Sequence, residues 1–207
     1  MIDLYYAPTP NGWKVTIMLE ECGLAYRVVP IDLQHGEQYK PGFLAINPNS
    51  KIPAIVDRDG EDGPQTVFES GAILLYLALK AGRFLPVETR PRTECFEWLF
   101  WQVSGLGPVL EQANYFRNKA PEHLPAVIER TTGEAERLLG VMDGRLATRE
   151  YLAGGAYSVA DIACWGWIHY LDKIGLSLAA YSHLQQWRDH IGTRSAVRRG
   201  VAVGADA

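Results

Sequence analysis

The strongest constraint on the fold of this chain is a change in the character of the sequence near residue 80. Before this point, short runs of β-branched and aromatic residues alternate with helical segments, whereas the remainder of the 207 residues has almost only helical periodicity. Gly82 is suited to end one helix, and Pro91 is suited to the first turn of the next. The sequence therefore predicts two domains, at residues 1–81 and 90–207, joined by a linker at 82–89.

The first domain is predicted to have the order β-α-β followed by β-β-α. Strands are expected at residues 2–6, 26–31, 54–57 and 65–68. The second strand should lie at a sheet edge because Pro30 cannot donate to a ladder, and the short turn after the third strand favours an antiparallel hairpin. The helix at residues 70–80 is apolar nearly all round, so we expect it to be buried on more than one side, between the sheet and the second domain. With Pro53 before the third strand, this order resembles the thioredoxin fold, which implies a cis Ile52-Pro53 bond.

The second domain is predicted to consist of helices only. One helix should begin near Pro91 and be kinked at residues 105–108, because Pro108 removes a hydrogen-bond donor. A second is expected at residues 123–146, and Ser158 with Asp161 forms a variant of the capping box before a buried helix. A last helix should contain Leu184, Trp187 and Ile191, and the tail at residues 200–207 is expected to fray.

Charge and cysteine content exclude several classes of function. Residues 1–80 carry six Lys or Arg against ten Asp or Glu, and the rest carries 14 of each, so the net charge is −4. This balance argues against nucleic-acid binding, which requires a basic surface. We also expect no secretory signal, because an acid stands at position 3 and no basic segment precedes an apolar stretch, and no membrane span, because the apolar runs are shorter than roughly 20 residues. The three cysteines, Cys22, Cys95 and Cys164, are too few and too scattered for a disulfide framework, so we expect a cytoplasmic protein.

Three segments resemble the glutathione transferase family, in the order and at the spacing of that family. They are NSKIPAI at residues 49–55, FESGAI at 68–73 and YSVADIA at 157–163. More narrowly, YAPTPNG at residues 6–12 and WLFWQV at 98–103 are similar to the nu class, the bacterial relatives of a yeast nitrogen regulator. The resemblance covers essentially the whole chain. It implies an α/β thioredoxin-like first domain that binds glutathione, an all-α second domain, no metal, and a homodimer.

The resemblance implies a binding role for residues around the second motif. Ser70 begins a helix, so its hydroxyl and N–H are suited to the γ-glutamyl carboxylate of glutathione, and Glu69 is suited to the ammonium. Alternatively, Ser70 is a plain N-cap and Glu69 a solvated acid. The backbone of Ile52, before Pro53, is expected to pair with the cysteinyl backbone of the ligand, as in strand addition.

Three further residues are weaker candidates for glutathione binding. Lys51 and Gln38 are suited to the glycyl carboxylate. The alternative for Lys51 is a surface lysine beside a turn, and the role of Gln38 depends on the nu-class resemblance. Arg130, in the second domain, either reaches the ligand or pairs with Glu134 on a solvated helix face.

The sulfur end of the site is defined by a missing cysteine. Thioredoxin-like redox enzymes place a cysteine at the N-terminus of the first helix, where its pKa falls, but here the sequence has Thr9-Pro10-Asn11. The reactive thiol must therefore come from glutathione, with Thr9 and Asn11 stabilising its thiolate. The alternatives are a local turn for Thr9, an N-cap for Asn11 and, for Tyr5 and Tyr6, packing in the strand.

Three hypotheses about activity follow. The preferred one is glutathione-dependent reduction of small disulfides, and of organic peroxides by the same logic, through thiolate attack. The second is conjugation of glutathione to a small electrophile, which uses the same binding motifs. The third is binding of glutathione or another ligand without turnover, in a regulatory protein.

Overall fold

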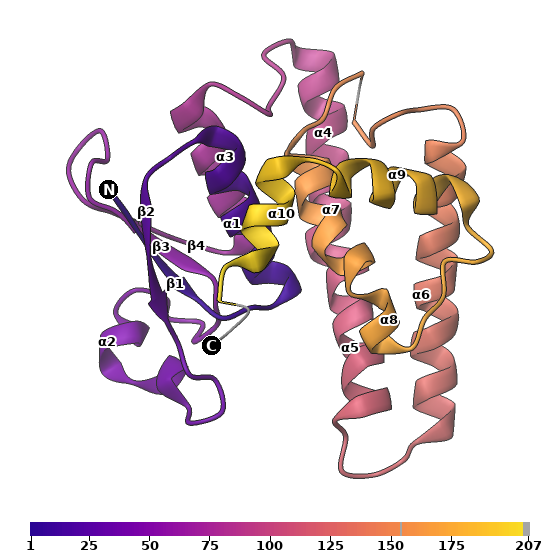
Figure 1. The fold of residues 1–207 in the computed structure, drawn as a ribbon. Helices are drawn as coiled ribbons and strands as arrows, with labels where there is room; N and C mark the ends of the chain where they lie inside the picture. Colours follow the sequence, from indigo (N-terminus) through magenta and orange to yellow (C-terminus); the bar gives the residue numbers. More distant parts are fainter. Residues whose placement is uncertain (154, 205–207) are drawn as a thin grey trace. The chain divides into compact units, whose positions relative to one another are not determined.

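The computed structural model of the protein describes residues 1–153 and 155–204, which form two units (Figure 1). The first unit contains residues 1–83 together with the segment that begins at Arg194, and the second is Phe84–Thr193. The predicted ranges, 1–81 and 90–207, assign that last segment to the helical domain instead. No helix among the described residues is long and apolar enough to span a membrane.

The first unit is built on a four-stranded sheet in the order β2-β1-β3-β4. The strands are β1 (Ile2–Tyr6), β2 (Tyr26–Pro30), β3 (Ala54–Asp57) and β4 (Gln65–Phe68). β1 is parallel to β2 and antiparallel to β3, which forms an antiparallel pair with β4. The predicted strand order and hairpin are confirmed, and β2 lies at the edge, where Pro30 removes no central hydrogen bond.

Two main helices cover this sheet, α1 (Pro10–Cys22) and α3 (Ser70–Ala81), and they pack against each other. Short turns, η1 (Glu37–Tyr39) and α2 (Pro41–Leu44), connect β2 to β3. Within α3, Ile73, Leu74, Leu77 and Ala78 are buried, as expected for so apolar a helix, whereas Leu79 is 72 % exposed. The C-terminal end of α3 therefore has an uncovered apolar side chain.

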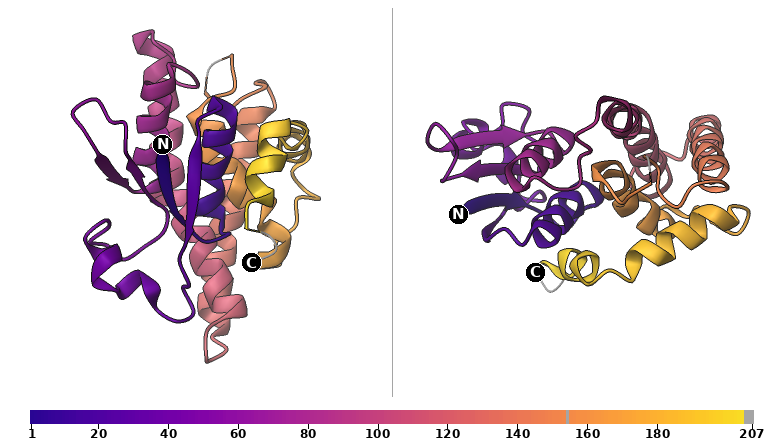
Figure 2. Two further views of the ribbon diagram at one scale, coloured as in Figure 1. Left: turned by 60° about the vertical axis from the view of Figure 1, so that its left-hand side comes forward. Right: turned by 90° about the horizontal axis from the view of Figure 1, so that it is seen from above.

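The C-terminal segment packs on the first unit, and residues 200–202 of the tail expected to fray belong to a helix. It forms α10 (Ser195–Ala202), which lies along α1 in both views of Figure 2. The close approach requires Gly200, since a Cβ there would lie 2.7 Å from the backbone nitrogen of Ile17. The Thr16 hydroxyl donates to the Gly200 carbonyl at 2.7 Å, and Arg194 forms two hydrogen bonds with Glu21. Residues 205–207 of the predicted tail lie outside the described residues.

One end of the sheet is closed by ion pairs, and we call it the ion-pair end. Asp3, at the start of β1, is 2 % exposed and accepts hydrogen bonds from the guanidinium groups of Arg58 at 2.6 Å and Arg27 at 2.9 Å. The bond from Arg58 is the largest of the effects that hold the pKa of Asp3 below its usual value. Its carboxylate is therefore ionised and fully partnered at neutral pH.

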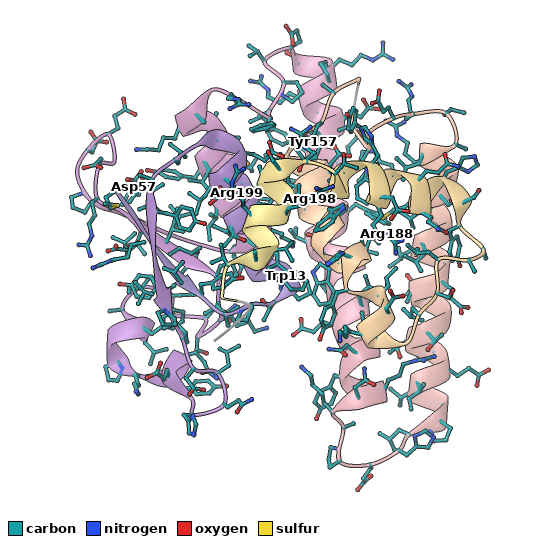
Figure 3. All side chains as sticks on the ribbon, in the orientation of Figure 1. Trp13, Asp57, Tyr157, Arg188, Arg198 and Arg199 are labelled. Atoms are coloured by element: carbon teal, nitrogen blue, oxygen red, sulfur yellow. The ribbon has the colours of Figure 1, made fainter. Side chains whose placement is uncertain are left out.

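Asp57, at the last position of β3, belongs to the same end and is labelled in Figure 3. Its carboxylate is fully buried, lies 2.7 Å from Lys80 Nζ, and accepts hydrogen bonds from the Tyr76 hydroxyl at 2.7 Å and the Asp59 N–H at 3.0 Å. Burial raises the pKa of Asp57, but these three partners together outweigh it and the net pKa is lowered. This cluster ties α3 to the sheet.

The second unit is helical throughout its regular elements, as predicted. These are α4 (Thr89–Trp101), η2 (Gln102–Leu106), α5 (Gly107–Asn118), α6 (Pro125–Leu146), α7 (Val159–His169), α8 (Leu171–Ile174) and α9 (Ser182–Gly192). At the expected kink, before Pro108, the structure has η2, one turn of π-helix. A wider turn accommodates the missing N–H and the ring of a proline.

The buried helix α7 begins with the predicted capping box. The Ser158 N–H donates to Asp161 at 3.1 Å, and the Ser158 hydroxyl accepts from the Ala160 N–H at 3.3 Å. Asp161 is fully buried and also accepts from the indole N–H of Trp187 at 3.0 Å. Burial raises the pKa of Asp161 to about 6 despite these bonds. The residue therefore organises the helical core and has no access to a ligand.

Candidate functional site

The predicted site residues of the first unit meet at the end of the sheet opposite the ion pairs, which we call the site end. The pairing register aligns Tyr5 of β1 with Ala54 of β3, and Ala54 with Phe68 of β4. Because β1 and β4 run in one direction and β3 in the other, the residues after β1, before β3 and after β4 lie at the same end of the sheet. This brings together three segments distant in sequence, namely residues 9–11, 51–53 and 69–70 (Figure 1).

Thr9 and Asn11 form the beginning of α1. Thr9 is the N-cap, with extended backbone angles, and its Oγ1 accepts a hydrogen bond from the Gly12 N–H at 3.1 Å. Gly12 is required there, since a Cβ would lie 2.4 Å from the Ala7 carbonyl oxygen. Asn11 is half-buried in the first turn, so the alternative that it acts as the N-cap is wrong. The positive end of the helix dipole therefore lies beside Thr9 and Asn11.

The segment before β3 contains a cis Ile52-Pro53 peptide bond, as the thioredoxin resemblance implied. Asn47, which is 2 % exposed, holds this segment: its amide donates to the Lys51 carbonyl at 2.6 Å and accepts from the Asn49 N–H at 2.9 Å. Ile52 is half-buried and Lys51 is exposed. A buried asparagine thus sets the position of the backbone that would pair with a peptide ligand, a role that the sequence analysis missed.

Glu69 and Ser70 form the start of α3. Glu69 is the N-cap and has a φ of 68° with a ψ of 119°, a conformation that is costly for a residue with a Cβ. Its Oε1 accepts a hydrogen bond of 3.4 Å from the side-chain amide of Asn49. Strained backbone of this kind is concentrated at functional sites, and here it directs an exposed carboxylate and the adjacent Ser70 toward the site end.

Lys14 is a second residue at this end that the sequence analysis missed. It lies on α1, is 1 % exposed, and its Nζ donates a hydrogen bond to Ser70 Oγ at 3.2 Å. A signal existed in the sequence, because Lys14 lies between Trp13 and Val15, directly before the mostly apolar stretch of residues 15–19. The helix spacing alone could not show which residue the ammonium contacts.

The remaining candidates differ in position. Gln38 lies in η1, beyond the end of β2, where its amide donates a 3.5 Å hydrogen bond to the Leu33 carbonyl. Its Oε1 is buried and has no hydrogen-bond partner among the described residues. Arg130 belongs to the second unit, on an exposed face of α6, where it contributes to lowering the pKa of Glu134 after the larger effect of Arg137. Its contacts within the second unit thus include an electrostatic effect on Glu134.

The thiols of the protein are poorly suited to redox chemistry. Burial raises the pKa of Cys22, the last residue of α1, to about 11 and also raises the pKa of Cys95. Cys95 and Cys164 are buried in the second unit. A nucleophilic cysteine needs the opposite, a lowered pKa, which a helix N-terminus provides and the C-terminus of α1 does not.

The tyrosines of β1 are engaged in contacts within the first unit. Tyr6 is 2 % exposed and donates to the Val203 carbonyl at 3.0 Å, and burial raises its pKa to about 12. Tyr5 packs against Phe43, with 6.0 Å between the ring centres. Within residues 1–153 and 155–204, no group of three or more His, Cys, Asp or Glu side chains is placed to hold a metal ion.

Two family models match this chain. The glutathione S-transferase N-terminal domain matches residues 9–80, and the glutathione S-transferase C-terminal domain matches residues 125–190. The first match contains every candidate residue of the site end, from Thr9 to Ser70. The second contains Arg130 and the capping box of α7.

Among known proteins, the chain is 51 % identical over 203 residues to the disulfide-bond oxidoreductase YfcG of Escherichia coli, which covers 97 % of this chain and 94 % of the relative. A glutathione transferase family member from Pseudomonas fluorescens, solved with two glutathione molecules bound, has a TM-score of 0.92 at 40 % identity and covers 97 % of this chain and 92 % of that one. A Pseudomonas putida glutathione transferase, solved with one glutathione disulfide per subunit, has a TM-score of 0.92 at 36 % identity, with coverages of 99 % and 92 %. The order β-α-β-β-β-α of the first unit, the helical second unit and these matches agree: the chain belongs to the glutathione S-transferase family of enzymes.

Proposed function

We propose that this protein is a glutathione-dependent disulfide-bond reductase in which the thiolate of bound glutathione, and no protein cysteine, attacks the substrate. The observation that carries the proposal is the start of α1, where Thr9 and Asn11 occupy the position of a redox cysteine. The thiols of Cys22 and Cys95, with raised pKa values, are disfavoured as nucleophiles. The identity to a relative named as a disulfide-bond oxidoreductase favours the same activity.

In the proposed complex, glutathione spans the site end. The N-terminus of α3 and the Ser70 hydroxyl bind the γ-glutamyl carboxylate, because helix N-termini attract anions. Glu69 binds the ammonium of the same residue, and the Ile52 backbone beside cis Pro53 pairs with the cysteinyl backbone. This arrangement directs the cysteinyl sulfur toward Thr9 and Asn11, where the dipole of α1 and their polar groups favour the thiolate.

The glycyl end of glutathione has two candidate partners. Lys51 is exposed and can extend its ammonium to the carboxylate, and Gln38 has an amide that can turn toward it. Arg130 of the second unit stays a third, weaker candidate.

The proposed reaction proceeds in two exchanges. The bound glutathione thiolate attacks one sulfur of the substrate disulfide, which forms a mixed disulfide and releases one substrate thiolate. A second glutathione thiolate attacks the glutathione sulfur of that mixed disulfide, which releases the other substrate thiolate and forms glutathione disulfide. Two electrons pass from two glutathione molecules to the substrate, and each released thiolate takes up one proton. The P. fluorescens relative with two glutathione molecules and the P. putida relative with glutathione disulfide support a site of this capacity. Reduction of an organic peroxide would use the same two thiols and yield an alcohol and water.

The direct test is a comparison of two reactions with purified protein and glutathione, using a small dialkyl disulfide and an aryl halide. We expect turnover of the disulfide that greatly exceeds conjugation of the halide. Rapid conjugation without disulfide reduction would favour the transferase alternative. Failure to bind glutathione and glutathione disulfide in calorimetry would contradict both enzymatic hypotheses.

A triple variant, Cys22→Ser with Cys95→Ala and Cys164→Ala, tests whether the nucleophilic thiol belongs to glutathione or to the protein. We expect disulfide turnover within about twofold of the wild type, because the reacting sulfur is that of glutathione. The matched opposite is Thr9→Ala with Asn11→Ala, which keeps all cysteines and should slow turnover at saturating glutathione. Circular dichroism melting checks that both variants fold. A folded triple variant without activity would return a protein thiol to the mechanism.

We also propose that the protein is a homodimer in a reducing compartment such as the cytoplasm. Exposed apolar side chains of the first unit, Phe68 at 38 % and Leu79 at 72 %, are suited to burial against a second copy. The three cysteines are free thiols, and the proposed reaction consumes reduced glutathione. Light scattering after size exclusion should give a molar mass of twice that of the chain. For Leu79→Glu, the measured mass should fall to that of a single chain.

A further inference from the structure

Lys14 is a buried cation that the proposed reaction does not yet use. It is 1 % exposed, lies on α1, and its Nζ donates a hydrogen bond to Ser70 Oγ at 3.2 Å, across the contact between α1 and α3. Burial of an ammonium group is unfavourable unless charged or polar partners compensate for it. The Ser70 hydroxyl is one of the polar partners of this ammonium, and it belongs to a residue of the proposed site.

The position of Lys14 on its helix directs the ammonium to the site end. Lys14 follows Asn11 by three residues, so the two lie on the same side of α1. Side chains of α-helices also lean toward the N-terminus of the helix, which here is the end that faces the site. The ammonium thus lies beside Ser70, to which it donates a hydrogen bond.

The contact restricts what the serine hydroxyl can do. An ammonium group has three donors and no acceptor, whereas a hydroxyl has one donor and two acceptor lone pairs. Ser70 Oγ must therefore accept from Lys14, and its own proton must point to a different acceptor. Because Ser70 is half-buried at the first position of α3, an anion at this helix N-terminus is placed to receive that proton.

We infer that Lys14 is a positioning residue for the γ-glutamyl carboxylate of glutathione: it holds the Ser70 hydroxyl as a donor and adds positive charge behind the N-terminus of α3. The inference rests on the proposed function, in which Ser70 binds this carboxylate. It also explains how an acidic domain receives an anion, with one cation enclosed behind the site and shielded from solvent.

The test is a cycle of two proteins and two ligands, measured by calorimetry. The ligands are glutathione and 4-aminobutyryl-cysteinyl-glycine, which lacks only the α-carboxylate of the γ-glutamyl group. The proteins are the wild type and Lys14→Met, which removes the charge and keeps an unbranched side chain. Lys14→Arg tests rescue by a conservative change, and Lys80→Met is the matched control, because it removes an ammonium from the opposite end of α3, at the ion-pair end.

We expect Lys14→Met to bind glutathione about tenfold more weakly than the wild type and to bind the analogue equally well, because the lost contact acts only on the carboxylate. Lys14→Arg and folded Lys80→Met should have the same ratio of dissociation constants for the two ligands as the wild type. In the disulfide assay, Lys14→Met should raise the KM for glutathione and leave kcat nearly unchanged. If Lys14→Met does not fold, Lys14→Gln takes its place, because it keeps a donor for Ser70 and removes the charge. In this variant the affinities for glutathione and for the analogue must differ less than in the wild type.

Two results would overturn the inference in distinguishable ways. If the wild type binds glutathione and the folded Lys14 variants weaken both ligands equally, Lys14 is structural and the proposed function stands. If the wild type binds no glutathione, the proposed function and the role of Lys14 are both wrong.

Discussion

The two ends of the sheet in the first unit use polar residues in opposite ways. At the ion-pair end, Asp3 and Asp57 are buried and enclosed by guanidinium, ammonium and hydroxyl groups of the same unit. At the site end, the chain instead has a cis peptide bond before Pro53, a strained Glu69 and two helix N-termini. The ion-pair end contributes stability, whereas the site end keeps donors and charges in place for a ligand. The predictions below test this division, from the largest expected effect to the smallest.

The largest effect should come from Asp57→Ala. It removes a fully buried carboxylate and leaves the Tyr76 hydroxyl, the Asp59 N–H and the Lys80 ammonium without it. We expect the free energy of unfolding in urea to fall by about 2–3 kcal/mol. This is less than the usual cost of breaking a fully buried ion pair, because the Lys80 side chain is partly exposed. The Kd of the folded fraction for glutathione should not change. A large change in this Kd would mean that the two ends are coupled.

The same comparison should depend on pH. The folded pKa of Asp57 is lowered, so its contribution to stability is complete above the unfolded value of 3.8 and is lost as the pH falls through the folded value. We therefore expect the difference in unfolding free energy between the wild type and Asp57→Ala to be constant from pH 7 to pH 5 and to shrink below 3.8. A difference that shrinks already between pH 7 and pH 5 would contradict the lowered pKa.

Ser70→Ala should have its main effect on binding. The variant removes the hydroxyl that faces the γ-glutamyl carboxylate but leaves the helix N-terminus, so we expect glutathione to bind about tenfold more weakly. Stability should fall by about 1 kcal/mol, because the buried ammonium of Lys14 loses the Ser70 Oγ that accepts its hydrogen bond. Isothermal calorimetry and urea unfolding measure the two quantities separately. A loss of stability without a loss of affinity would make Ser70 a structural residue.

The smallest and most discriminating effect is expected for Glu69→Gly. Glycine adopts positive φ without the Cβ penalty, so relief of the strain at φ 68° should raise the unfolding free energy by roughly 1 kcal/mol. Affinity for glutathione should fall at the same time, because the carboxylate that binds the ammonium is gone. Glu69→Gln, which keeps the backbone strain, is the matched control and should lose affinity without any gain in stability. A lower stability of Glu69→Gly would show that the strain carries no cost.

The sequence alone determined the order of elements, the edge position of β2 and the segments that form the site end. Pro30 cannot donate to a ladder, and a β-α-β-β-β-α order with Pro53 before β3 is compatible with few folds. The absence of cysteine at Thr9-Pro10-Asn11 was equally a property of the sequence, and it led to the proposed mechanism.

Other features were decided only by tertiary structure, because they depend on which surfaces pack together. Residues 200–202 of the tail expected to fray belong to α10, since Gly200 lets the backbone approach Ile17 and Thr16 on α1. Leu79 of α3 is exposed, although the apolar composition of the helix does not show which of its side chains stays uncovered. Lys14 and Ser70 are 56 positions apart in the chain, and only the packing of α1 on α3 brings an ammonium behind a hydroxyl. Periodicity identifies the face on which a side chain lies, but the partner on the opposing face depends on the folded whole.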